Sequence, residues 1–302
     1  MKISISSMIK DYSVSFESAF DSIAGDLKNE GTRFIIDRKV FELYSDKFLE
    51  ISKDQFSENI CYFIDANEST KTMSNAQNII KFLIESNFKR NSTLIAIGGG
   101  ITQDLTCFVA SILYRGVDWK FYPTTLLAQC DSCIGSKSSI NVGTYKNQVG
   151  TFYPPKSIVV DVSFLSTLSN DDILSGLGEA IKVHYLDPQK RSERIDHDYS
   201  AALTSKKCME DLIRKSLIIK KDVIEKDEFD KDYRNIMNYG HTFGHAIEAV
   251  TKYQIPHGIA VTIGMKIANH LSYSLGLLSA EDMTKMSQLL SDNSGDYKFD
   301  IT

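Results

Sequence analysis

The chain has 302 residues, of which 42% are hydrophobic and 24% charged, and its formal net charge at pH 7 is −5. This length suits one large domain or two of ordinary size, with enough apolar residues for a core. The acidic balance argues against a nucleic-acid-binding protein, which would normally carry a basic surface. An anionic small molecule is still a possible ligand, because a pocket can be locally basic.

The N-terminal segment MKISISSMIKDYSVSF alternates apolar and polar residues and lacks both the apolar core and the cleavage site of a signal peptide. No uninterrupted apolar run approaches the roughly 18 residues of a membrane span. The five cysteines form an odd set without a disulfide framework, which is typical of a reducing compartment. We therefore expect a cytoplasmic protein with no membrane partner.

In the first half of the chain, short apolar runs alternate with patterns of helical spacing, which predicts a parallel sheet with crossover helices. The segments are TRFIIDRKVFELY (strand, then helix), ENICYFIDANEST (strand, then polar loop), SNAQNIIKFLIESNF (helix), STLIAIGGGITQDLTCFVASIL (strand, glycine turn, helix), and the strand signals in VDWKFYPTTLLAQCDSC and KSIVVDVSFLSTL.

Beyond residue 168 the pattern becomes helical throughout. Helices are predicted in DDILSGLGEAIKVHYL, in the run from about Ser200 to Glu225, in HTFGHAIEAVTKY and in HGIAVTIGMKIANHLSYSLGLL. We expect an α/β domain with a parallel sheet over residues 1–168 and an all-helical domain over residues 169–302. A ligand would be expected in a cleft between two such domains.

A glycine turn, Gly98 to Gly100, ends the predicted strand LIAI and precedes a helix. Glycines there let the backbone approach a phosphate, and the helix N-terminus offers free N–H groups. The turn lacks the GxGxxG spacing, so a tight strand-to-helix turn without a ligand explains it equally well.

The histidines carry a stronger signal. His241 and His245 are four residues apart and would share one face of a helix, while His257 follows in IPHG and Glu179 lies in GLGEAIK. Two or three histidines with a carboxylate are typical of a catalytic zinc site. HTFGH lacks the glutamate that follows the first histidine of zinc peptidases. Nothing in the spacing of the other histidines, His184, His197 and His270, suggests a site.

Several basic residues are compatible with an anion site, although surface lysines are the default explanation: Lys137, Lys146 with Asn147, Lys182, Lys220 and Arg234. The first three lie in SKSSINVGTYKNQVGTFYPP, a predicted loop whose cations and amides could surround a phosphate. Cys130 and Cys133 in CDSC have no second CxxC and are predicted to be ordinary buried thiols.

Seven motifs stand in the order and spacing of one family: GGGITQD, YRG, PTTLLAQCDSCIGSK, KNQVGTFYPP, GLGEAIK, YRNIMNYGHTFGHAIE and PHG. Over roughly residues 30 to 275 the chain resembles the 3-dehydroquinate synthases. The resemblance implies an NAD-binding α/β domain, a helical metal-binding domain and a homodimer.

The resemblance also implies roles for individual residues. Glu179, His241 and His257 would bind zinc, with cobalt as a substitute, and His245 would contact the substrate phosphate. NAD would be held by Asp37, Glu68, Lys71, Gly99, Gly100, Asp104, Thr124, Thr125, Lys146 and Thr167. Substrate contacts would come from Asp131, Lys137, Lys146, Asn147, Lys182, Lys220, Arg234 and Asn238, and Arg115 would reach into the partner subunit's site.

The implied reaction converts 3-deoxy-arabino-heptulosonate 7-phosphate, an anionic sugar phosphate, to 3-dehydroquinate and phosphate, in aromatic amino acid biosynthesis. Oxidation by NAD, phosphate elimination, re-reduction, ring opening and aldol closure follow one another, and Arg234 with Lys220 would bind the substrate carboxylate. If residues 234–241 are helical, then Arg234, Asn238 and His241 lie close to one face.

Two features depart from the family pattern. Its GGK is GSK here, with Ser136 between Gly135 and Lys137, and the C-terminal segment is short, so a further phosphate-binding lysine of the family lies beyond it. The alternatives are another cyclase of the superfamily, such as a 2-epi-5-epi-valiolone or 2-deoxy-scyllo-inosose synthase, a metal-dependent polyol dehydrogenase, and a catalytically inactive binding protein.

Overall fold

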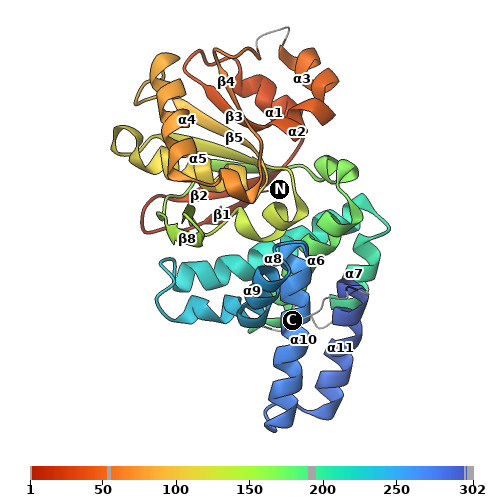
Figure 1. Ribbon diagram of the computed structural model, residues 1–302. Helices are drawn as coiled ribbons and strands as arrows, with labels where there is room; N and C mark the ends of the chain where they lie inside the picture. Colours follow the sequence, from red (N-terminus) through yellow and green to blue (C-terminus); the bar gives the residue numbers. More distant parts are fainter. Residues whose placement is uncertain (1, 53–55, 190–194, 296, 298–302) are drawn as a thin grey trace. The chain divides into compact units, whose positions relative to one another are not determined.

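The computed structural model describes residues 2–52, 56–189, 195–295 and 297 (Figure 1). The chain divides into two compact units, Met1–Thr167 and Leu168–Thr302, each described here by itself. No helix in the described part of the chain is long and apolar enough to cross a membrane.

The N-terminal unit is built on a sheet whose described strands are seven in number, in the order β1-β2-β9-β6-β5-β3-β4. They are β1 (Lys2–Ile5), β2 (Tyr12–Phe16), β3 (Arg33–Asp37), β4 (Cys61–Ile64), β5 (Thr93–Gly98), β6 (Asp118–Pro123) and β9 (Ser157–Val160). All neighbouring pairs are parallel except β1 with β2. The predicted parallel sheet is confirmed, and the alternating N-terminal segment adds an antiparallel edge to it.

Helices cover both faces of this sheet: α1 (Ala19–Asp26), α2 (Arg38–Leu43), α3 (Ser45–Ser52), α4 (Met73–Glu85) and α5 (Gly100–Ile112). Helices α1, α2 and α3 share one apolar cluster with Phe34, Ile36, Ile95 and Ile97 of the strands. Because side chains alternate along a strand, the residues between these point to the other face, where α5 contacts β5, β6 and β3 (Figure 1). Burial on both faces explains why these strands are almost continuously apolar.

The predicted loop around Lys146 contains a small hairpin instead. Strands β7 (Ile140–Val142) and β8 (Tyr145–Val149) pair antiparallel, and Gly143, at φ +58°, lies in the turn between them. Its glycine, serine and asparagine content indicated a loop, but glycine is also the residue that a tight hairpin turn requires at positive φ.

The C-terminal unit is helical, as predicted: α6 (Asn170–Tyr185), α7 (Ile195–Ala202), α8 (Lys206–Lys226), the 3-10 helix η5 (Tyr233–Asn238), α9 (His241–Val250), α10 (His257–Ser274) and α11 (Ala280–Ser294). The helical run expected from Ser200 to Glu225 is interrupted at residues 203–205, between α7 and α8. A new helix starts there after Ser205.

Glycines let the helices of this unit approach backbone to backbone. A Cβ on Gly258 of α10 would lie 1.8 Å from the Ser175 carbonyl oxygen of α6, and a Cβ on Gly178 would lie 2.3 Å from the Gly258 carbonyl oxygen. On the other side of α10, a Cβ on Gly264 would lie 2.1 Å from the carbonyl oxygen of Gly240. These contacts hold α6, α9 and α10 together where their functional side chains emerge.

Candidate active site

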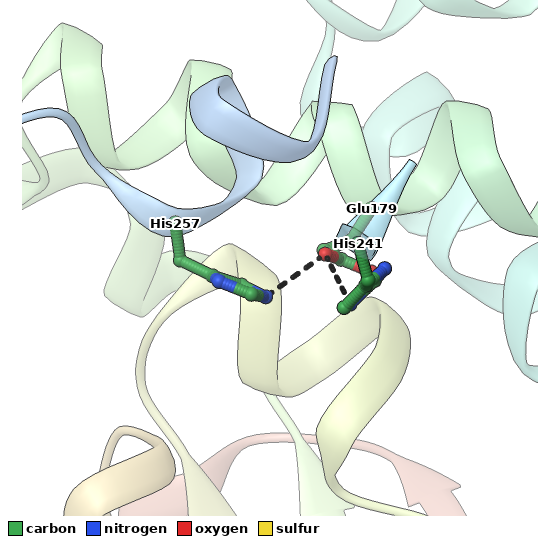
Figure 2. Close-up of side chains that lie close together, drawn as sticks. All are labelled: Glu179, His241 and His257. Atoms are coloured by element: carbon green, nitrogen blue, oxygen red, sulfur yellow. Dashed lines mark ion pairs between the residues drawn. The ribbon is translucent and has the colours of Figure 1, made fainter. Parts of the chain in front are cut away.

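Three side chains from the three tightly packed helices converge in the C-terminal unit (Figure 2). Glu179 comes from α6, His241 is the first residue of α9 and His257 the first residue of α10. The Glu179 Oε1 atom lies 3.3 Å from His257 Nε2 and 3.8 Å from His241 Nε2. One potential ligand atom from each residue lies within 4.8 Å of the other two.

The chain reaches His241 through a break rather than a continuous helix, which corrects the expected helical face. The 3-10 helix η5 ends at Asn238, and Gly240 at φ +79° precedes the first residue of α9. Arg234 is buried whereas Asn238 is exposed, so the i, i+4 and i+7 relation expected of Arg234, Asn238 and His241 does not hold. A glycine is needed at the break because other residues strain at such a φ.

Charge is distributed unevenly among the three side chains. Burial opposes ionisation of Glu179, but Lys182, His257 and His241 outweigh it and hold the pKa of this carboxyl well below its usual range. Burial lowers the pKa of His241 to about 4, so its imidazole is neutral. Burial also disfavours a charge on His257, but the carboxylates of Glu179 and Glu248, which face its two ring nitrogens, prevail and raise its pKa to about 10.

This group fits a divalent metal ion. Both Glu179 carboxylate oxygens are buried, and among the described residues neither makes a hydrogen bond of normal geometry, although Lys182 forms a close ion pair with the carboxylate. Two imidazoles and one carboxylate are the donor set of a catalytic zinc site with an open coordination position. The convergence of Glu179 with the two histidines could not be predicted from spacing, because His241 lies 62 positions and His257 78 positions further along the chain.

Two further residues lie beside this centre. The His245 ring centroid is 5.2 Å from that of His241 and 5.8 Å from that of His257. Glu248, which the sequence did not single out, lies 3.1 Å from the Nδ1 atom of His257 through its Oε2 atom. The sequence feature that could have identified Glu248 is its position three residues after His245, on the same face of α9.

The proposed carboxylate-binding residues of this unit are buried cations. Lys220 of α8 is 7% exposed and Arg234 is 5% exposed. The Arg234 guanidinium donates a hydrogen bond to the Glu228 carbonyl oxygen at 2.7 Å, and its backbone N–H donates to Asp227 Oδ2 at 3.1 Å. These bonds fix the start of η5 and the direction of the guanidinium.

In the N-terminal unit, the proposed NAD residues gather at one edge of the sheet. Asp37 ends β3, Glu68 follows β4, Gly99 and Gly100 follow β5, Thr124 and Thr125 follow β6, and Thr167 ends the 3-10 helix after β9. Carboxyl ends of parallel strands meet at the same edge, where open α/β sheets bind ligands. Burial raises the pKa of Asp37, which caps α2 by accepting from the Lys39 backbone N–H.

The glycine turn leaves room for a ligand. A Cβ on Gly98 would lie 2.4 Å from Thr102 Oγ1, so this glycine serves the turn itself. A Cβ on Gly100 would meet nothing nearer than Ser132 Oγ at 3.9 Å. The open space and the free N–H groups of the first turn of α5 together suit a dinucleotide phosphate.

A polar network joins this edge to the hairpin. Lys71 Nζ lies 3.0 Å from Asp104 Oδ2 and 2.6 Å from Asn147 Oδ1, and Ser139 Oγ lies 2.9 Å from the same two atoms. Burial raises the pKa of Asp104, against the influence of Lys71. Asn141 adds a second link, donating to Glu68 Oε1 at 2.7 Å. Ser139 and Asn141 were not predicted, since nothing in their spacing distinguishes them.

The remaining candidates of this unit differ in exposure. Asp131 is nearly buried in a short π-helical turn (Ala128–Ser132), whereas Lys137 and Arg115 are exposed and Lys146 is half-buried. Arg115, at φ +66°, lies in a turn in which its neighbours Tyr114 and Gly116 also have positive φ. Cys130 and Cys133 are buried thiols, as predicted.

Both halves of the chain match models of one protein family. Residues 61–175 match 3-dehydroquinate synthase N-terminal, and residues 176–301 match 3-dehydroquinate synthase C-terminal. The chain belongs to the 3-dehydroquinate synthase family. The resemblance seen in the sequence is thereby confirmed.

Relatives in this family extend further than the chain does. A 3-dehydroquinate synthase of Clostridium tetani is 42% identical over 249 residues, which cover 82% of this chain and 66% of the relative. One from Caldanaerobacter subterraneus is 37% identical over 279 residues, covering 91% of this chain and 78% of the relative. The chain thus spans about two thirds to four fifths of these relatives.

Solved structures confirm the fold class predicted for this family member. A 2-deoxy-scyllo-inosose synthase complexed with carbaglucose-6-phosphate, NAD+ and Co2+ aligns with a TM-score of 0.85 at 26% identity, covering 96% of this chain and 82% of that one. A 2-epi-5-epi-valiolone synthase from Streptomyces hygroscopicus with NAD+ and Zn2+ bound has a TM-score of 0.81 at 24% identity, covering 92% and 80%. The second likeness shows the fold alone.

Proposed function

We propose that the chain is a 3-dehydroquinate synthase-type cyclase, a phosphate-eliminating lyase that uses NAD and a divalent metal. Its substrate would be 3-deoxy-arabino-heptulosonate 7-phosphate, and its products 3-dehydroquinate and phosphate. The observation that carries the proposal is the convergence of Glu179, His241 and His257 in a member of this family. The metal is proposed to be zinc, with cobalt as a substitute.

These three residues would hold the metal, and the carboxyl edge of the parallel sheet would hold NAD. When bound, the metal supplies a Lewis acid for neighbouring hydroxyl groups, and NAD supplies a hydride acceptor that regains its hydride within one turnover. Lys182 keeps Glu179 ionised as a ligand, since its ammonium group lowers the pKa of that buried carboxyl.

Other residues of the chain would bind the two anionic ends of the substrate. Lys137, Lys146, Asn147 and His245 are proposed for the phosphate, and Lys220 and Arg234 for the carboxylate. Asp131, Lys182 and Asn238 are proposed to contact the rest of the substrate. Support for the carboxylate contacts comes from the chemistry of the two side chains, because both are cationic and a guanidinium suits a bidentate carboxylate.

A homodimer is proposed, with Arg115 serving the partner subunit's site. Its support is the strained backbone of Tyr114 and Arg115, since positive φ values are costly for residues other than glycine and cluster at functional sites. The proposed location is the cytoplasm, where buried thiols such as Cys130 and Cys133 stay reduced.

Another sugar-phosphate cyclase is the second candidate, favoured by the TM-score of 0.85 to a 2-deoxy-scyllo-inosose synthase. Two buried basic residues, Arg234 and Lys220, favour the carboxylate-bearing substrate over sugar phosphates that have no carboxylate. A protein described as a probable glycerol dehydrogenase from Sinorhizobium meliloti shares the fold at 15% identity and a TM-score of 0.58, so it supports no shared substrate.

The test is phosphate release by the zinc-loaded protein with NAD, using three substrates in parallel. We expect release from 3-deoxy-arabino-heptulosonate 7-phosphate and little from sedoheptulose 7-phosphate or glucose 6-phosphate. Preferential release from either of these sugar phosphates, which have no carboxylate, would reassign the chain to another cyclase. The His257→Ala variant is the matched control, and it should lose metal and phosphate release together.

A further inference from the structure

His257 faces a carboxylate with each of its two ring nitrogens. Nε2 lies 3.3 Å from Glu179 Oε1, and Nδ1 lies 3.1 Å from Glu248 Oε2. Glu179 comes from α6 and Glu248 from the second half of α9, so the ring lies between two helices. Both carboxylates are buried, at 1% and 8% exposure.

Only one of the two ring nitrogens of His257 can bind a metal ion while the ring is neutral. A neutral imidazole has one lone pair and one N–H, and the group that accepts from the N–H decides which nitrogen is left to bind metal. When Nε2 binds an ion beside Glu179 and His241, it gives up its own hydrogen, and the one hydrogen of the neutral ring is then on Nδ1. Glu248 lies at hydrogen-bond distance from that atom.

We propose that Glu248 is a positioning residue of the metal centre. It accepts the Nδ1–H of His257, holds the ring in the tautomer whose Nε2 lone pair faces the site, and adds a negative charge beside the cation. The proposal rests on the metal centre of the proposed function and adds a residue that works through His257.

His241 provides an internal comparison. Its Nδ1 atom lies 3.3 Å from the Tyr239 carbonyl oxygen, and its Nε2 atom also points toward Glu179. Both histidines therefore present Nε2 to the site and Nδ1 to an acceptor, but only His257 has a charged acceptor. A hydrogen bond to a carboxylate is stronger than one to a neutral carbonyl and makes the ring a better electron donor.

The group His245, Glu248 and His257 is itself compact enough to hold a metal ion. A second ion there would have to bind His257 Nδ1 while Nε2 serves the first centre, and the ring would then have to lose its N–H altogether. The geometry therefore favours one ion and one hydrogen bond over two ions that share a ring.

The experiment titrates zinc into the metal-free full chain and measures stoichiometry and Kd against a competing chelator. Variants are Glu248→Ala and the nearly isosteric Glu248→Gln, with Glu281→Gln, on the exposed first turn of α11, as the matched control for loss of a carboxylate. We expect one zinc per wild-type chain and a Kd about 10- to 100-fold higher in Glu248→Ala. Glu248→Gln should lie between, because its amide oxygen can still accept, and the Glu281 variant should match wild type.

A second readout separates positioning from a loss of folding. In zinc-loaded wild type, the Nδ1–H of His257 should give a slowly exchanging proton signal by NMR, and Glu248→Ala should lose it while retaining its far-UV circular dichroism spectrum. Unchanged zinc affinity in Glu248→Ala would overturn the proposal while leaving the metal centre intact. Two zinc ions per wild-type chain, one of them lost in His245→Ala, would overturn it in favour of a shared ring. No zinc binding by wild type would instead overturn the metal centre and the proposed function.

Discussion

Replacing Gly258 with Ala should force α6 and α10 apart where they pack backbone to backbone, and the metal centre should then lose its affinity for zinc. The added Cβ would lie 1.8 Å from the Ser175 carbonyl oxygen and 2.7 Å from its carbonyl carbon, and no side-chain rotation can relieve a clash between backbones. Contacts between heavy atoms settle near about 3.5 Å, so the helices must separate by roughly 1.5 Å.

That displacement affects both stability and the site. It would break the 3.0 Å hydrogen bond from the Gly258 N–H to Ser175 Oγ and move Glu179, one turn further along α6, away from His257. Overpacking costs about 1–3 kcal/mol, and a backbone clash belongs at the upper end. Metal distances tolerate only about 0.2 Å, so zinc affinity should be lost as well.

Hydrogen exchange measured peptide by peptide is the suitable assay, because a chain of two units has no single free energy of unfolding. A loss of about 3 kcal/mol corresponds to roughly 100-fold faster exchange of the protected amides in α6 and α10. The control is Gly25→Ala in α1, where a Cβ would meet nothing within 4 Å and helix propensity should add about 0.5–1 kcal/mol. Unchanged exchange and zinc binding in Gly258→Ala would refute this account of the packing.

Three other substitutions test separate parts of the structure. His184→Gln should remove a pH dependence of stability. Burial lowers the pKa of the His184 imidazole from 6.5 to about 4, so the folded state loses stability as the pH falls from 6.5 toward 4. The full loss is roughly 3 kcal/mol, at about 1.4 kcal/mol per pKa unit. Hydrogen exchange of the α6 amides at pH 7 and pH 5, corrected for the intrinsic effect of pH, should show roughly 2 kcal/mol of this loss, and an equal loss in the variant would contradict the prediction. Lys71→Met leaves the Asp104 carboxylate without its ammonium partner, at a cost of about 3 kcal/mol. Trypsin should then cut the hairpin of this variant after Lys146. A variant as resistant to trypsin as the wild type would count against the network. Arg234→Leu should lower kcat/KM for 3-deoxy-arabino-heptulosonate 7-phosphate by an amount equivalent to about 2–5 kcal/mol, with zinc and NAD occupancy unchanged. Unaltered kinetics would remove Arg234 from the site.

Sequence periodicity predicted the elements well where burial is uniform. The strand LIAI before the glycine turn and the helix of GLGEAIK follow directly from apolar patterns, because strands buried on both faces and long amphipathic helices leave strong periodic signals. The hairpin at Ile140–Val149 was wrongly predicted as loop, since its strands have only three and five residues and only its turn residue marks it.

The site was less predictable, for geometric reasons. The helical face expected of Arg234 and His241 fails because Gly240 ends one segment at positive φ before the next begins, and spacing alone cannot show such a break. Glu248 was missed because its partner, His257, belongs to another helix. A sequence shows which residues share a face, but not which faces meet, and here glycines such as Gly258 bring them together.

The proposed function is tested most directly by following phosphate and reduced nicotinamide in the same reaction. Zinc-loaded protein with a limiting amount of NAD is supplied with 3-deoxy-arabino-heptulosonate 7-phosphate. Because the hydride is returned within each turnover, the account predicts many phosphates released per NAD and no accumulation of reduced nicotinamide absorbance. Reduced nicotinamide that accumulates in step with substrate loss, without phosphate release, would contradict it and identify a dehydrogenase.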